Sequence, residues 1–237
     1  MHELAEHEIT QIPISNFDLD SYLYQRECSP NFVVIEIGHG GNPITSHQVY
    51  KGKRAYIGIE SWQRRHPAFD KIWSETLSSI RKRKDENIFF VDQDTGFKSV
   101  NNYENNSFGI NNGRYDESMV ETEFPDGAAD EVYLSNVFGD RQVTSGQNTK
   151  LLLKEVSRLV DRSGKVVIRE SLTPDRSLLS MSDQEDLQNH GLKLEAKYTA
   201  ASDLTEWRKL ETVYKGAHNP IGISTDSYYL ILSKISD

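Results

Sequence analysis

The sequence contains a single cysteine, Cys28, so the chain cannot form an intramolecular disulfide. No group of cysteines and histidines has the spacing of a structural zinc site, and we expect no metal. No apolar run approaches the roughly 18 to 20 residues that a membrane helix needs. Residues 1–20 also lack the basic start and apolar centre of a secretory signal. These absences predict a cytoplasmic protein that does not enter membranes.

Basic residues are in the minority. The chain has 27 lysines and arginines against 36 aspartates and glutamates, a formal net charge of −9. A broad phosphate-binding face is therefore not expected, which makes a nucleic-acid partner unlikely. The one basic cluster, residues 81–84, ends a predicted helix, where cations are favoured by the helix dipole. We favour that role over an RNA contact.

Seven short apolar runs alternate with longer polar or helical stretches. This alternation is typical of a doubly wound α/β sheet, and 237 residues suffice for one such domain. We predict a Rossmann-like, mostly parallel seven-stranded sheet with helices on both faces. The last strand is expected at an edge or inserted between others. The predicted strands are residues 32–37, 55–59, 88–91, 131–134, 165–168, 192–196 and 228–232.

Helices are predicted between these strands. Residues 62–81 and 148–160 carry helical patterns, the second with an apolar stripe that includes Leu151 and Leu152. A further helix begins with a capping box at Ser182, and Gly191 can end it.

Two segments lie outside this pattern. Residues 1–30 are expected to form an N-terminal helical cap, ahead of a main domain of residues 31–237. Residues 94–130 are rich in asparagine and glycine and have little periodicity. We interpret them as a surface insertion or lid within the main domain.

A glycine-rich turn, Glu36 to Gly41, directly follows the first predicted strand. Glycines let the backbone turn sharply and approach a ligand at the carboxyl edge of an α/β sheet. A dinucleotide-binding fingerprint would place its third glycine at position 43, but Pro43 stands there, which disfavours a nicotinamide-dependent oxidoreductase. Glu60 ends the next strand, where a carboxylate can accept hydrogen bonds from the ribose hydroxyls of a nucleoside cofactor.

Five segments in order resemble the class I methyltransferases that use S-adenosylmethionine (SAM), over about residues 32–200. The glycine-rich turn resembles the motif whose backbone holds the amino-acid end of SAM. Glu60 matches the family's acidic residue on the ribose, and Asp92 matches the acidic position near adenine. Residues 124–136 and 151–170 resemble two later segments of the family. The resemblance implies SAM as cofactor, bound through Glu36, Gly38, His39, Gly40, Glu60, Asp92 and Asn136.

The resemblance also implies transfer of a methyl group from SAM to an acceptor by in-line displacement. The acidic balance favours a small-molecule or peptide acceptor, methylated on oxygen or nitrogen. His218, Tyr22 and Tyr24 are the candidates for a general base if the acceptor must lose a proton. Arg169 is expected either to bind an anionic acceptor or to pair with a neighbouring acidic residue. A non-catalytic SAM-binding module that acts through a partner and an RNA methyltransferase remain as alternatives.

Overall fold

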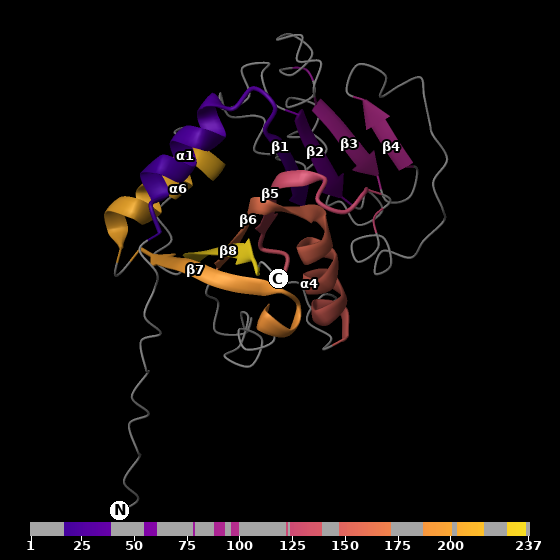
Figure 1. Ribbon diagram of the computed structural model, residues 1–237. Helices are drawn as coiled ribbons and strands as arrows, with labels where there is room; N and C mark the ends of the chain where they lie inside the picture. The colour runs from indigo at the N-terminus through magenta and orange to yellow at the C-terminus, as the bar shows by residue number, and fades with distance from the viewer. Residues whose placement is uncertain are drawn as a thin grey trace, which may run out of the picture.

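The computed structural model describes about half of the chain (Figure 1). Among the described helices, none is long and apolar enough to cross a membrane. The described residues are 17–38, 55–60, 78, 88–92, 96–99, 122, 124–138, 147–171, 187–200, 203–215 and 227–235.

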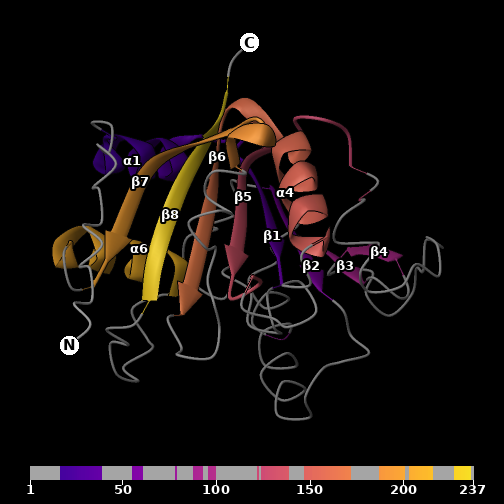
Figure 2. The same cartoon turned by 90° about the horizontal axis from the view of Figure 1, so that it is seen from below.

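The described strands form one eight-stranded sheet in the order β4-β3-β2-β1-β5-β6-β8-β7 (Figure 2). Their bounds are β1 Val33–Ile37, β2 Ala55–Glu60, β3 Ile88–Asp92, β4 Gly96–Ser99, β5 Ala129–Ser135, β6 Val160–Ser171, β7 Leu192–Thr199 and β8 Ser227–Lys234. All seven predicted strands are confirmed. The predicted number is nevertheless wrong, because β4 adds an eighth strand.

The sheet is mixed. β1, β2, β3, β5 and β6 are parallel to one another, whereas β4, at one edge, pairs antiparallel with β3, and β8 pairs antiparallel with both β6 and β7. β8 is thus inserted between two strands and does not form an edge. β4 escaped prediction because Phe97 is its one apolar residue, so it shows no alternation and was assigned to the 94–130 insertion.

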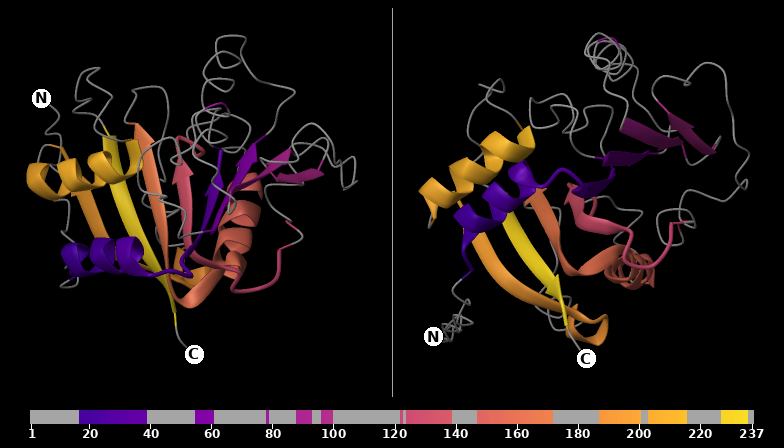
Figure 3. Two further views of the ribbon diagram at one scale, coloured as in Figure 1. Left: turned by 90° about the horizontal axis from the view of Figure 1, so that it is seen from above. Right: turned by 45° about the horizontal axis from the view of Figure 1, so that its top comes forward.

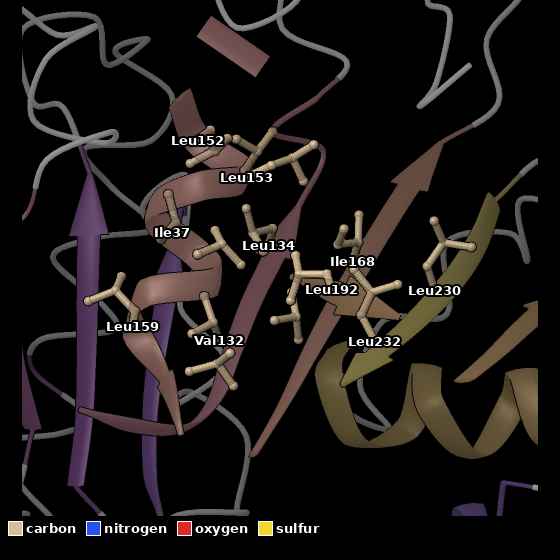
Figure 4. Packing of buried hydrophobic residues seen from close by; sticks show 14 of the residues in the cluster. Ile37, Val132, Leu134, Leu152, Leu153, Leu159, Ile168, Leu192, Leu230 and Leu232 are labelled. Atoms are coloured by element: carbon tan, nitrogen blue, oxygen red, sulfur yellow. The ribbon is translucent and has the colours of Figure 1, made fainter. Parts of the chain in front are cut away.

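Helix α4 (Gln147–Leu159) covers one face of the sheet. It confirms the predicted helix, although Leu151 is 38% exposed and Leu153 is buried in its place. Burying a leucine side chain contributes about 1.5–3 kcal/mol, so this packing is a major source of stability. Figure 4 shows the resulting core, in which Leu152, Leu153 and Leu159 face Ile37, Val132, Leu134, Ile168, Leu192, Leu230 and Leu232.

Helices α1 (Leu19–Cys28) and α6 (Leu204–Lys215) lie side by side on the opposite face (Figure 3). Helix α1 begins after Asp18, whose carboxylate accepts a hydrogen bond from the Ser21 amide at 3.0 Å. Helix α6, which was not predicted, buries Trp207, Leu210 and Tyr214 at helical spacing. The two helices enclose a second core, and helices on both faces are thereby confirmed.

Other predicted segments are described only in part. The helix expected from Ser182 is described over its last turn, where Gly191 ends it with a φ of +72°. Of the helix expected at 62–81, Ser78 alone is described and is helical. Residues 1–16 of the expected cap and residues 100–121 of the expected insertion lie outside the described residues.

Candidate functional site

Four neighbouring parallel strands, β3, β2, β1 and β5, have their carboxyl ends at one edge of the sheet (Figure 2). Glu60 and Asp92, the last residues of β2 and β3, are register partners. Gly38 follows β1 and stays in the ladder, because its amide donates to the Ile59 carbonyl at 2.9 Å. Asn136 follows β5 on the other side of β1. The fold therefore brings four of the predicted cofactor-binding positions to adjacent strand ends.

The backbone conformation at this edge requires a glycine at position 38. Its φ is +76°, in the left-handed region that favours glycine. A Cβ atom at this position would lie 2.7 Å from Cγ2 of Val137, well inside van der Waals contact. The turn after β1 therefore packs directly against the turn after β5, and the absence of a side chain at Gly38 makes that close approach possible.

The turn after β5, residues 136–138, is held by the end of β6. The amide of Asn136 donates to the carbonyl of Arg169 at 2.8 Å. The amide of Phe138 donates to Oε1 of Glu170 at 2.9 Å, and both of these side chains are buried. Asn136 has a φ of 56° and an exposed side chain. Asparagine tolerates this left-handed conformation better than most residues.

Glu36 lies in the interior, next to the predicted cofactor site along the chain. Its side chain is buried, and the Tyr56 hydroxyl donates to Oε2. Burial raises the pKa of the nearby Tyr133, and the negative charge of Glu36 raises that pKa further. Glu36 therefore belongs to a polar cluster within the sheet layer, while its predicted contact with the cofactor stays a prediction.

Arg169 pairs with an acidic residue, the second of its two expected roles. Its Nε donates to Oε1 of Glu211 on α6 at 2.8 Å, and the Tyr229 hydroxyl donates to the same oxygen at 2.5 Å. Burial and the charge of Glu211 raise the pKa of Tyr229, so its hydroxyl remains a hydrogen-bond donor. This cluster fixes α6 on the sheet beside the end of β6.

The two tyrosines considered as general bases lie on α1. Tyr22 is buried, and its hydroxyl donates to Oε2 of Glu131. Burial raises the pKa of Tyr22 well above its ordinary value. Tyr24 is 70% exposed, and a hydrogen bond with Cys28 raises its pKa. The hydroxyl of Tyr22 is thus engaged inside the fold, and the roles of both tyrosines as general bases stay predictions.

Three predicted site residues, His39, Gly40 and His218, lie outside the described residues. Their roles stay predictions. Val137 and Glu170 belong to the site region and were not singled out from the sequence. The signal available for both was their position at the carboxyl end of a predicted strand.

Neither a family profile nor a curated protein matches the chain. Similar crystal structures include a TehB-like SAM-dependent methyltransferase from Corynebacterium glutamicum, at a TM-score of 0.51 and 12% identity, covering 91% of this chain and 85% of that one. The geranyl diphosphate C-methyltransferase from Streptomyces coelicolor A3(2) gives a TM-score of 0.52 and 12% identity, covering 91% of this chain and 78% of that one. The cyclase SpnF gives a TM-score of 0.53 and 10% identity, covering 92% of this chain and 81% of that one.

Identities this low establish architecture and not chemistry. Each of the three likenesses nevertheless covers about nine-tenths of the chain. The chain has the Rossmann-like fold of the class I SAM-dependent methyltransferases.

Proposed function

We propose that the chain is a SAM-dependent methyltransferase whose cofactor binds at the carboxyl edge of β1, β2, β3 and β5. One observation carries the proposal. Four positions that match SAM-binding positions by resemblance lie at or just after the ends of adjacent strands of this fold: Gly38, Glu60, Asp92 and Asn136. Open α/β sheets bind their ligands at this edge.

The residue types at the edge fit SAM. Gly38, with its positive φ and no Cβ, lets the backbone approach the amino-acid end of the cofactor, together with His39 and Gly40. The carboxylate of Glu60 suits the two ribose hydroxyls, and that of Asp92 suits the adenine amino group. Glu36 and Asn136 are the other two residues that we propose to contact SAM.

When bound, SAM supplies a methyl group that its sulfonium already activates. The chain must therefore mainly align an acceptor with that group, and a base is required only where the acceptor carries a proton. We propose a small-molecule or peptide acceptor with a nucleophilic oxygen or nitrogen, because the net charge of −9 disfavours RNA. His218, Tyr22 and Tyr24 are the candidates for that base.

A second candidate is a SAM-binding protein that does not methylate. The likeness to the cyclase SpnF favours its consideration, because one fold serves reactions of different kinds. Turnover separates the two candidates: a methyltransferase forms S-adenosylhomocysteine when given a suitable acceptor. Binding of SAM without that product, across peptide, RNA and small-molecule acceptors, would favour a non-methylating protein.

The experiment that tests the cofactor site is the SAM affinity of Glu60→Ala. Loss of a charged acceptor for the ribose hydroxyls should weaken binding by more than about tenfold, or about 1.5–3 kcal/mol. Glu27→Ala, at an exposed position on α1, is the matched control and should bind as the unmodified chain does. Equal affinities of Glu60→Ala and the unmodified chain would contradict the assignment.

A further inference from the structure

A buried carboxylate lies behind the proposed cofactor edge. Glu170, the penultimate residue of β6, is 1% exposed. Its Oε1 accepts the amide of Phe138 at 2.9 Å. The preceding residue of β6, Arg169, accepts the Asn136 amide through its carbonyl. The end of β6 thus holds the first and third amides of the 136–138 turn, one of them through a charged side chain.

This turn needs such support. Asn136 adopts a φ of 56°, a left-handed conformation that asparagine tolerates but that must be held in one place for the turn to keep its shape. A buried amide is also costly to leave without an acceptor, and a carboxylate is a stronger acceptor than a neutral group. Glu170 meets both needs because it fixes the Phe138 amide two residues after Asn136.

The 136–138 turn also limits the space around Gly38. Val137 stands between the two supported amides, and its Cγ2 lies 2.7 Å from where a Gly38 Cβ would be. Movement of the Phe138 amide would therefore displace Val137 and release the turn after β1. The contacts run in sequence from Glu170 through Phe138 and Val137 to Gly38.

We propose that Glu170 is a positioning residue for the cofactor edge, which shapes the turn at Gly38 without touching the cofactor. The inference rests on the proposed function for its consequence in SAM binding. Its structural part, the coupling of Glu170 to Gly38, stands on the described contacts alone.

The test compares Glu170→Ala with Glu170→Gln in the full chain. Alanine removes the acceptor, whereas the glutamine amide oxygen can still accept from Phe138. We expect Glu170→Ala to weaken SAM binding about tenfold or more, and Glu170→Gln to restore most of the affinity. Amide hydrogen exchange by NMR, without SAM, should show faster exchange at both Phe138 and Gly38 in Glu170→Ala.

Glu155 offers a matched control. It is also buried, on α4, and its Oε1 accepts the Thr122 amide at 2.8 Å, a contact of the same kind. Glu155→Ala should lower the melting temperature, yet leave SAM affinity and Gly38 exchange unchanged. A general loss of stability would move both alanine variants together, and that outcome overturns the proposal.

The proposed function and the positioning role of Glu170 can fail separately. If the unmodified chain does not bind SAM, the proposed function fails, while exchange at Gly38 still tests the coupling. If Gly38 exchange is the same in Glu170→Ala and the unmodified chain, the positioning role is wrong, whatever the SAM affinity.

Discussion

Arg26 on α1 and Glu131 on β5 form an ion pair with both side chains fully buried, at a distance of 2.7 Å between Nε and Oε2. The Tyr22 hydroxyl donates to the same carboxylate oxygen. Arg26 also lies over the ring of Tyr214, 5.0 Å from its centroid. These contacts join the N-terminal helix to the centre of the sheet through charge as well as apolar packing.

Removing one partner of this pair should be strongly destabilising. Arg26→Met leaves the Glu131 carboxylate buried without its counter-charge, and we expect a loss of about 3–5 kcal/mol in the free energy of unfolding, measured in urea. Lys209→Met is the control, because Lys209 of α6 is partly exposed and pairs with Asp20 of α1 and with Glu206. That change should cost no more than about 1 kcal/mol. Similar losses in the two variants would show that burial does not decide the contribution.

Two glycines with similar φ values allow the cost of backbone strain to be measured apart from the cost of steric overlap. Gly38 and Gly191 have φ values of +76° and +72°. A Cβ at Gly191 would meet its nearest atom, Oγ of Ser157, at 3.5 Å, an ordinary contact, whereas one at Gly38 would overlap Val137. Both alanine variants should lose about 1–2 kcal/mol from the positive φ, and Gly38→Ala should lose more.

Gly38→Ala should also weaken SAM binding, and Gly191→Ala should not. Adding Val137→Ala to Gly38→Ala should recover part of the extra loss in stability, because it removes the overlapping atom but not the strain. Urea unfolding of the three variants and SAM titration check these expectations. A Gly38→Ala protein as stable as Gly191→Ala would contradict the described approach of the two turns.

Asn136 allows the fold and the proposed cofactor contact to be tested apart. Its φ of 56° suits glycine, so Asn136→Gly should leave the melting temperature nearly unchanged. If the exposed side chain binds SAM, the same variant should lose affinity. Asn136→Val should lower both, because a β-branched residue is strained at this φ. Full SAM affinity in Asn136→Gly would remove Asn136 from the proposed site.

Glu155 should contribute to acid unfolding. Burial alone would raise its pKa, but hydrogen bonds from Arg158 and Thr122 outweigh burial and hold the pKa below the ordinary value. The stabilisation is therefore fully present above the unfolded pKa of about 4.3 and is lost as the pH falls through the lower folded pKa. The stability difference between the unmodified chain and Glu155→Gln should shrink over that range. A difference that stays constant down to pH 2 would contradict the prediction.

The sequence predicted the elements whose signals are local. Continuous apolar runs identified seven strands, and the apolar stripe within residues 148–160 identified α4. The helical pattern could not show which of the three consecutive leucines at 151–153 face the core. Leu151 was assigned to the core, although its side chain is exposed. Helix α6 was missed although it also carries a local helical signal in Trp207, Leu210 and Tyr214.

Features that depend on distant partners were beyond a reading of local patterns. Arg26 and Glu131 are 105 positions apart, and neither neighbourhood shows that the two charges are buried together. Glu170 and Phe138 are 32 positions apart, and nothing in the sequence near either residue indicates that the Glu170 carboxylate accepts the Phe138 amide. The strand-end positions proposed to bind the cofactor could be predicted because they lie at or just after the ends of recognisable strands, and parallel strands bring such positions to one edge.

The most direct test of the central claim is titration calorimetry of the purified chain with SAM, S-adenosylhomocysteine and NADH. The proposed site predicts micromolar binding of the two sulfur nucleosides, with dissociation constants that correspond to about −8 kcal/mol, and no binding of NADH. Binding of NADH, or of none of the three ligands, would contradict a SAM site at the carboxyl edge of β1, β2, β3 and β5.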